Sequence, residues 1–173
     1  MPVVRLGALL VAISAIAWSG CGAGDESAGP EATHPVEIAD QEDAVCGMLV
    51  GEQSAPRAQL IHRDGERAFF CSIGDLLVQL SSPSPHGATR AVFVEVMQPD
   101  EDPLQSHTAA HAWRRADEAT YVVGVDRPNI MGAPVLVYAS VDEARLVASR
   151  HVGSRVVDLQ ELKQWWAARQ AGR

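Results

Sequence analysis

Three kinds of residue are scarce in this chain of 173 residues. It has three cysteines, its aromatic residues make up only 5%, and 14 Lys and Arg face 22 Asp and Glu, so that the formal net charge is −8. Because no cluster of Lys and Arg is present that could follow a phosphate backbone, the composition argues against nucleic acid as a partner. With so few aromatic residues, the core must consist mainly of Val, Leu, Ile and Ala.

Sequence motifs of catalysis are missing as well. The chain contains no G-x-S-x-G, H-E-x-x-H or C-x-x-C motif and no glycine-rich phosphate-binding loop. We therefore expect a protein that is not an enzyme. What remains is an ordinary globular composition, 47% apolar and 21% charged, and a length that suits one compact domain or two small lobes with a shared core.

The first twenty residues have the pattern of a secretory signal. Arg5 is followed by an apolar run that is short and lacks a stop-transfer flank, which argues against a membrane-spanning helix. The small residues before Cys21 resemble the lipobox of bacterial lipoproteins. That resemblance implies that residues 1–20 are removed and that Cys21 carries a lipid anchor in the cell envelope, facing the periplasm, with the outer membrane favoured because Gly22 follows. The alternative is an ordinary signal with a chance cysteine.

The rest of the chain divides into a tether and a folded domain. Residues 21–42 are rich in Gly, Ala, Pro and acidic residues and have little to bury, so we predict a flexible tether. Residues 43–173 are predicted to form an α+β domain of two consecutive ββα(β) units, about 43–98 and 118–170. The units are expected to pack together, because each alone would leave one apolar sheet face exposed.

The two halves show the same predicted order of elements. In the first, strands at 57–62 and 67–71 precede a helix capped by Ser72 and a strand at 89–97. Residues 98–113 are predicted to form an acidic loop. The second half is predicted to contain strands at 120–126 and 133–140, a helix over 141–150 capped by Ser140, a strand at 154–159 and a last helix that begins at Asp158.

A thiol and a thioether stand two positions apart at Cys46 and Met48. Both are soft donors, which select Cu(I) over harder ions such as Mg²⁺ or Ca²⁺. In an extended segment the two side chains would face the same side, and Gly47 would leave room for an ion. The alternative is that Met48 packs in the core together with the apolar Leu49 and Val50.

The order of several segments resembles the NosL family of copper-binding lipoproteins. The resemblance covers roughly residues 43–160 and rests on "VCGM", "APRAQLIH", "AFFCSIGDLL" and "YVVGV" followed by "IMGAPVLVY". It implies a pair of ββα units that bind Cu(I) through Cys46, Met48 and Met131. It also implies that copper is delivered to nitrous oxide reductase, with the help of a membrane transport complex. Independently, a methionine in the turn "RPNIMGAP" is better placed for a site than for a core.

Cys71 admits three interpretations. Its position before a helix N-cap would favour a thiolate, and hence a copper ligand or a reactive thiol. It could form a disulfide with Cys46, or it could be a small buried hydrophobic residue. Two rival functions follow from these alternatives. One is an envelope scaffold with a Cys46–Cys71 disulfide and no metal, and the other is an enzyme with a reactive cysteine pair, for which no general acid or base is evident.

Three histidines are candidate ligands through their imidazole nitrogens. His62 ends a predicted strand. His107 and His111 have i, i+4 spacing, which would place both on one face if their segment were helical. The segment is predicted to be a loop, however, so two solvated histidines are the more common outcome.

Overall fold

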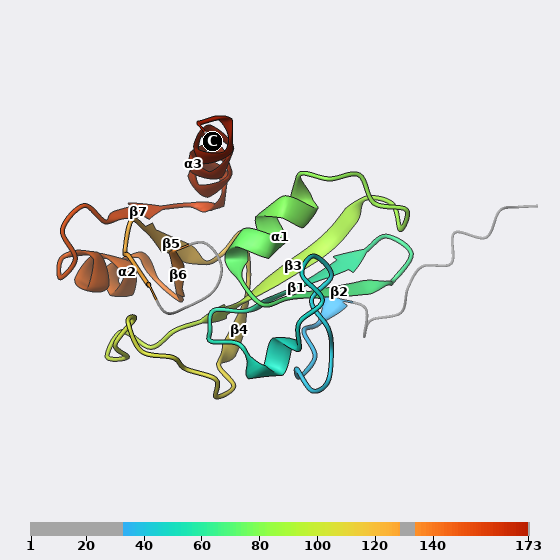
Figure 1. Ribbon diagram of the computed structural model, residues 1–173, viewed down its shortest axis with the longest axis horizontal. Coiled ribbons are helices and arrows are strands. Elements are labelled where there is room, and N and C mark those ends of the chain that lie inside the picture. The colour runs from blue at the N-terminus through green and yellow to red at the C-terminus, as the bar shows by residue number, and fades with distance from the viewer. Residues whose placement is uncertain (1–32, 129–133, 173) are drawn as a thin grey trace, which may run out of the picture.

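The computed structural model describes residues 33–128 and 134–172 (Figure 1). The predicted signal sequence at 1–20 and the predicted lipid attachment at Cys21 lie outside these residues. Within the described ranges, no helix combines the length and the apolar character that crossing a bilayer requires.

The first half has the predicted order of strand, strand, helix and strand. Its elements are β1 (Ala58–His62), β2 (Arg67–Phe70), α1 (Ile73–Leu80) and β3 (Thr89–Val96), preceded by the short 3-10 turn η2 (Val50–Glu52). β1 is central, with β2 antiparallel on one side and β3 antiparallel on the other.

The second half repeats this topology. It consists of β5 (Thr120–Val123), β6 (Val135–Tyr138), α2 (Val141–Ala148) and β7 (Arg155–Val157), and α3 (Leu159–Ala171) follows. Again the first strand is central, because β6 and β7 pair with opposite sides of β5, both antiparallel. The predicted α+β fold of two ββα(β) units is therefore confirmed.

One strand lies where the sequence analysis predicts a loop. β4 (Ala112–Arg115) pairs with β3 and extends the first sheet to four strands in the order β2-β1-β3-β4. Its residues are exposed or half-buried, since β4 is an edge strand. It therefore lacks the alternation of buried apolar residues by which strands are recognised, and the loop prediction was wrong at its C-terminal end.

The caps that begin the helices are those that the sequence predicts. Ser72 begins α1 and accepts a hydrogen bond from the amide of Asp75. Ser140 begins α2 in a reciprocal capping box with Glu143, and Asp158 begins α3 in the same way. A side-chain oxygen at this position satisfies an amide that has no partner within the helix.

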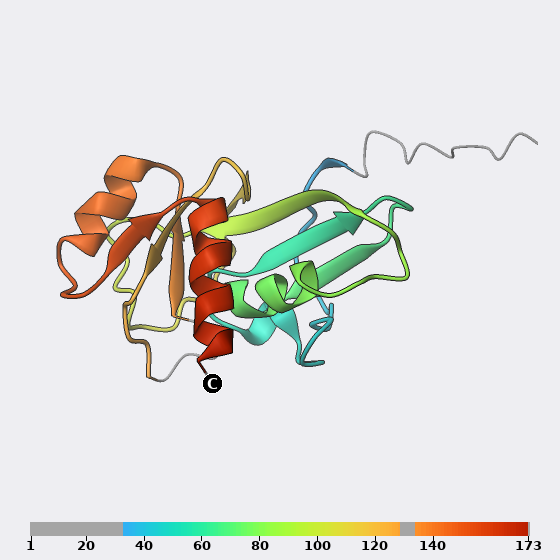
Figure 2. The same ribbon diagram turned by 90° about the horizontal axis from the view of Figure 1, so that it is seen from above.

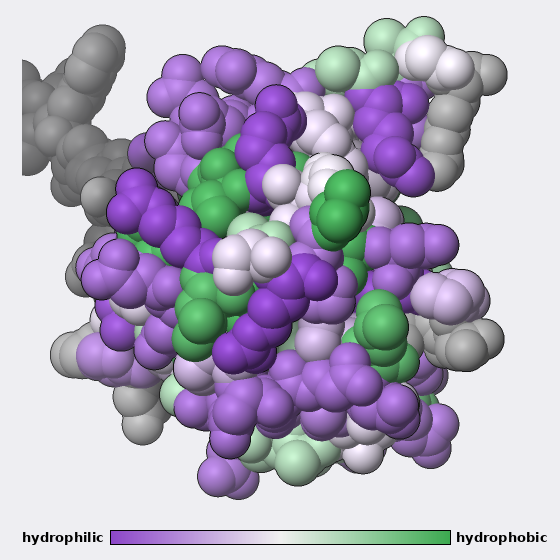
Figure 3. Space-filling model, turned by 90° about the vertical axis from the view of Figure 1, so that its left-hand side faces the viewer, coloured by the Kyte–Doolittle hydropathy of each residue, from purple (hydrophilic) through white to green (hydrophobic). Residues whose placement is uncertain are grey.

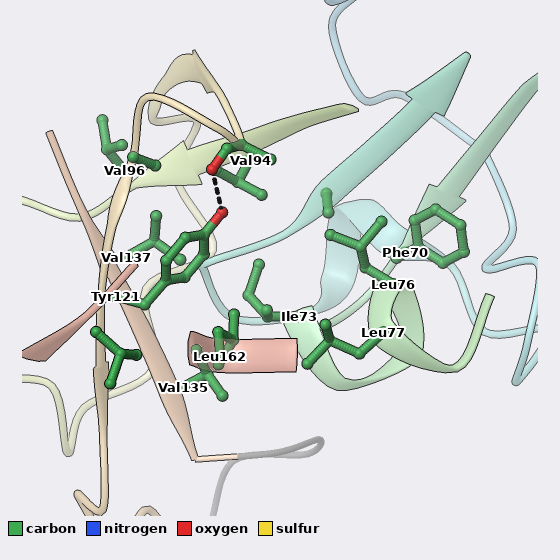
Figure 4. Packing of buried hydrophobic residues seen from close by; sticks show 14 of the residues in the cluster. Phe70, Ile73, Leu76, Leu77, Val94, Val96, Tyr121, Val135, Val137 and Leu162 are labelled. Carbon is green, nitrogen blue, oxygen red and sulfur yellow. Dashed lines mark hydrogen bonds between the residues drawn. The ribbon is translucent and has the colours of Figure 1, made fainter. Parts of the chain in front are cut away.

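The two halves share one hydrophobic core. Figure 4 shows side chains of α1 and β3 packed against those of β5, β6 and α3, and in Figure 2 α3 lies across the junction of the halves. The Tyr121 hydroxyl donates to the Ala116 carbonyl, 2.8 Å away, within this core. The Met97 amide donates to the Val137 carbonyl at 2.8 Å and joins the end of β3 to the second half. Neither half therefore buries its core alone.

The segment before residue 43 packs against the first sheet. The side-chain amide of Gln59, which is fully buried, exchanges two hydrogen bonds of 3.0 and 2.9 Å with the backbone of Val36. Glu42 forms an isolated bridge with Leu49. The part of the predicted tether from Val36 onward is thus anchored, because a buried glutamine side chain needs partners that only this backbone supplies.

The outer end of the second half is mainly hydrophilic. Figure 3 faces this end, and apolar residues occur there as separate spots among hydrophilic ones. Exposed Val141, Leu146 and Val152 lie on α2 and on the turn that follows it. Scattered apolar residues of this kind are normal for a protein surface.

Candidate metal centre

Cys46 lies at an exposed turn that the carboxylate of Asp43 organises. One oxygen of this buried carboxylate accepts hydrogen bonds from the amides of Val45, at 2.7 Å, and Cys46, at 2.9 Å. The Asp43 backbone also bonds to the Met48 carbonyl at 2.8 Å and to the Gly47 amide at 2.9 Å. The chain from Asp43 to Met48 is therefore a closed loop that presents Cys46 to solvent.

The expectation that this segment is extended was wrong. Gly47 has φ of +73°, in the left-handed region that glycine adopts without steric cost. The i, i+2 argument for Cys46 and Met48 does not hold in such a turn. The reason is Asp43, whose side chain competes for backbone amides and closes the chain locally.

The second cysteine comes to this turn from the end of β2. Cys71 stands between β2 and the N-cap of α1, and its amide donates to the other oxygen of Asp43. One carboxylate thus connects the turn to the start of the helix. The Ala44 amide, which donates to the Phe69 carbonyl at 3.0 Å, holds the turn alongside β2.

The two thiols are neighbours. Cys46 Sγ and Cys71 Sγ lie 3.9 Å apart, both as free thiols, and Cys71 Sγ lies 3.9 Å from the Met48 carbonyl. Metal–sulfur bonds of about 2.3 Å would place two sulfurs between about 3.8 and 4.6 Å apart, depending on the angle at the ion. Among residues 33–128 and 134–172, Asp43, Cys46 and Cys71 form one group whose ligand atoms all lie within 4.8 Å of one another.

The electrostatics of the group differ between its members. Burial by itself would raise the pKa of Asp43, but the amides of Cys71, Cys46 and Val45 outweigh it and hold that pKa below its usual value. The pKa of the Cys71 thiol is raised, chiefly by burial and then by the nearby charge of Asp43. Both effects oppose the thiolate that the position of Cys71 before the helix N-terminus would favour. Burial likewise raises the pKa of Asp75, in the first turn of α1.

Met48 is half-buried, and its two neighbours differ. Leu49 is exposed and Val50 is fully buried at the start of η2. Only Val50 of these three residues belongs to the buried apolar core. The core interpretation of Met48 thus loses its main support.

The other predicted ligands within the described residues are not assembled with the two thiols. Met131 lies outside the described residues. His62 is buried at the end of β1 that is remote from Cys71, because Phe70 pairs with Ala58 and His62 lies four residues further on. At about 3.3 Å per residue the separation along the strand is roughly 13 Å. The structure therefore does not bring His62 to the Cys46 turn.

The histidine pair of the loop before β4 is not on a helix. His107 and His111 lie in an irregular segment, and each has its own hydrogen-bond partners there. The helical i, i+4 geometry is therefore absent.

Asp43 is the member of the group that sequence reasoning overlooked. An Asp that precedes a turn by one or two residues is a signal for a side-chain-closed turn, and here the turn leads directly to Cys46-Gly47. Its second contact, with the Cys71 amide, joins residues 28 positions apart and has no signal in the sequence.

The chain is similar in sequence and in fold to known copper-binding proteins. A family model described as NosL matches residues 35–167. The copper-binding lipoprotein NosL of Stutzerimonas stutzeri is 28% identical over 168 residues, which cover 93% of this chain and 82% of the relative. The crystal structure of the copper chaperone NosL from Shewanella denitrificans superposes with a TM-score of 0.61 at 22% identity, covering 75% of this chain and 95% of that one. At that identity the likeness shows the fold.

Proposed function

Because this chain belongs to the NosL family, we propose that it binds Cu(I) at the Cys46 turn and delivers the ion to an acceptor. The observation that carries this proposal is the exposed thiol of Cys46, held 3.9 Å from a second sulfur. Two neighbouring soft donors select Cu(I) over harder cations. The family relatives are a copper-binding lipoprotein and a copper chaperone, in agreement with this chemistry.

The ligand set that we propose consists of Cys46 and Met48, completed by Met131. Cys46 supplies the solvent-facing thiolate through which copper arrives and leaves. Cys71 would act from the buried side as a further, weaker ligand, since its thiol must lose a proton that burial retains. Asp43 is not proposed as a ligand, because its two oxygens already accept three backbone amides and a hard carboxylate suits Cu(I) poorly.

Transfer follows from the asymmetry of the site. A ligand of the acceptor can reach copper from the side of Cys46, which is open, whereas Cys71 is closed off by the protein. Stepwise replacement of soft ligands then moves the ion without releasing it to water. By the resemblance of the family, the acceptor would be nitrous oxide reductase, reached with a membrane transport complex. A lipid on Cys21 would keep the protein at the periplasm-facing side of the envelope, favouring the outer membrane.

An anaerobic titration of Cu(I) against a chromophoric chelator tests the proposal. We expect residues 22–173 to bind one equivalent and Cys46→Ser to weaken binding at least about hundredfold, because a thiolate is lost. Met48→Leu should weaken binding by about tenfold, whereas Met97→Leu, which alters a buried methionine directly after β3, should leave it unchanged. If the fully reduced protein does not compete with the chelator, the proposal is wrong. Counting thiols in protein that has not been treated with a reductant then tests the disulfide scaffold, in which Cys46 and Cys71 offer no thiolate.

A further inference from the structure

A second group of metal-ligating side chains lies in the loop between β3 and β4. Glu101, His107 and His111 approach one another there, with a single carboxylate oxygen between the two imidazoles. The first sheet has the order β2-β1-β3-β4, so this loop leads to the edge opposite to the one that Cys71 follows. None of these three residues belongs to the group of Asp43, Cys46 and Cys71, so the two groups are distinct.

Both ring nitrogens of His111 face acceptors. Nδ1 lies 2.9 Å from the Ala109 carbonyl and Nε2 lies 2.9 Å from Glu101 Oε1. The His111 side chain is only 4% exposed, so water does not supply a hydrogen-bond partner to either ring nitrogen. A neutral imidazole donates through one nitrogen only, and its other nitrogen carries a lone pair. The Nε2 contact with Glu101 therefore needs either an added proton or a cation between the two atoms.

Like His111, His107 has a backbone carbonyl near one ring nitrogen and the Glu101 Oε1 atom near the other. Its Nε2 lies 2.8 Å from the Asp102 carbonyl, and its Nδ1 lies 3.8 Å from Glu101 Oε1. Each histidine thus donates one ring N–H to a backbone carbonyl, from Nε2 in His107 and from Nδ1 in His111, and its other ring nitrogen faces Glu101. Metal-ligating histidines are usually oriented in this way by a backbone acceptor. The Gln98 amide donates to Glu101 Oε2 at 2.8 Å and fixes the carboxylate as well.

Two buried arginines hold the loop in place. Arg57 is paired with Glu95 at 2.6 Å and also donates to the carbonyls of Thr108 and Ala109, at 3.3 and 2.9 Å. Arg127 donates to the Pro103 carbonyl at 2.7 Å. These contacts fix the backbone on both sides of His107, so the segment that carries the ligands is held in place.

We propose that Glu101, His107 and His111 bind one divalent transition-metal ion of the Zn²⁺ or Cu²⁺ class. Two imidazoles and one carboxylate suit such ions and not Cu(I), which prefers sulfur. Metal–ligand bonds of about 2.0–2.2 Å place the ligand atoms of a tetrahedral site about 3.3–3.6 Å apart, so the distances of 2.9 and 3.8 Å to Oε1 must both adjust when an ion binds. The three ligand atoms are less close to one another than those of the thiol group. Binding therefore requires a rotation of His107, whose side chain is 22% exposed.

Titration of the full chain with Co²⁺ in detergent, followed by displacement with Zn²⁺, tests this site. All samples carry Cys46→Ser, so that sulfur-to-cobalt absorption bands do not obscure the result. We expect one equivalent of Co²⁺ with visible bands of nitrogen and oxygen ligation. His107→Gln should weaken binding at least about tenfold, because one ligand is lost. The matched control His151→Gln, in the turn after α2, should bind as the parent does.

His111→Gln provides a second variant, and circular dichroism shows whether this buried substitution still folds. If the parent binds no Co²⁺, or if His107→Gln binds it as tightly as the parent, the proposal is overturned. In that case the contacts of the two histidines with Glu101 serve only to hold the loop. Because the thiol site is disabled in every sample, failure here leaves the Cu(I) proposal unaffected, and failure of Cu(I) binding leaves this one unaffected.

Discussion

The two halves of the molecule share one local structure, a strand followed by a Ser-capped helix, but differ in the residue that lies between the strand and the cap. In both, the second strand is followed by one residue, a Ser N-cap and an eight-residue helix. The intervening residue is Cys71 in the first half and Ala139 in the second. The two caps have nearly identical backbone angles, φ −147° and ψ 160° at Ser72 and φ −141° and ψ 160° at Ser140. The fold thus provides the same position twice, and only one copy carries a sulfur.

What distinguishes the first half is the turn that precedes its first strand, from Asp43 to Met48. Asp43 accepts the Cys71 amide and brings Cys46 alongside, whereas Ala139 follows β6 at a position without a thiol. The caps differ accordingly. Glu143 closes a capping box on Ser140, but Asp75 instead accepts from the Ser72 hydroxyl at 2.9 Å. The anchored turn is therefore what sets the candidate metal centre apart from the matching position in the second half.

The largest expected effect concerns what the halves share. Leu162→Ala should lower the free energy of unfolding by about 2–5 kcal/mol, because Leu162 is fully buried in the core formed by both halves. Urea unfolding followed by fluorescence and by circular dichroism should give one coincident transition. The control Leu146→Ala, at an exposed position of α2, should change the stability by less than about 0.5 kcal/mol. Two separate transitions would show that the halves are independent units.

Cys71→Ala makes the first half resemble the second. We expect Cu(I) affinity to fall by about tenfold, less than for Cys46→Ser, because the exposed thiolate remains and only the buried sulfur is lost. The chelator competition described above measures both variants on one scale. An unchanged affinity would mean that Cys71 is only a small buried side chain, and a larger loss than with Cys46→Ser would reverse the proposed order of the ligands.

Asp43→Asn removes the anchor of the turn. A neutral amide cannot accept from all three backbone N–H groups, so we expect stability at pH 7 to fall by about 1–3 kcal/mol. The folded-state pKa of Asp43 lies below its usual value of 3.8, so its carboxylate stabilises the fold above about pH 4, and this contribution is lost as the pH falls through the folded-state value.

Urea unfolding between pH 3 and pH 7 measures this difference. The parent should lose stability more steeply than Asp43→Asn below about pH 4, and the two should converge at the acid end. The control Asp142→Asn alters a carboxylate that is 96% exposed and should follow the parent throughout. Parallel curves for the parent and Asp43→Asn would contradict the anchoring role.

The smallest expected effect is that of Ala139→Cys. This variant places a thiol at the matching position of the second half, but no counterpart of Asp43 and Cys46 lies beside it among the described residues. We therefore expect the Cu(I) stoichiometry to remain at one equivalent in the chelator competition. A second equivalent of similar affinity would show that the strand–Ser–helix position is sufficient and that the preceding turn is dispensable.

The elements were predictable where local chemistry decides them. Ser72, Ser140 and Asp158 begin helices because a side-chain oxygen satisfies the first free amides, and this signal needs no distant partner. β4 was not predictable in this way. It is an edge strand whose exposed residues carry no periodic apolar pattern, and its pairing with β3 is decided by the sheet.

The candidate site was predictable in its chemistry and not in its geometry. Cys46 and Met48 indicate a soft metal from residue type alone. Cys46 and Cys71 are brought together by Asp43, whose carboxylate accepts hydrogen bonds from the amides of both residues. No spacing in the sequence encodes this contact. The exclusion of His62 has the same origin, since the register of β1 and β2 places it at the far end of the strand.

The sequence by itself determined the order of the elements, their caps, the soft donors and the repeated ββα(β) plan, because each of these depends on residues that are neighbours in the chain. Only the tertiary structure decided which sulfurs meet, which thiol is exposed and which histidines share a carboxylate. These contacts depend on strand register and on buried carboxylates and arginines that form hydrogen bonds with the backbone of distant segments. Such hydrogen bonds stabilise the protein only when the whole core has formed.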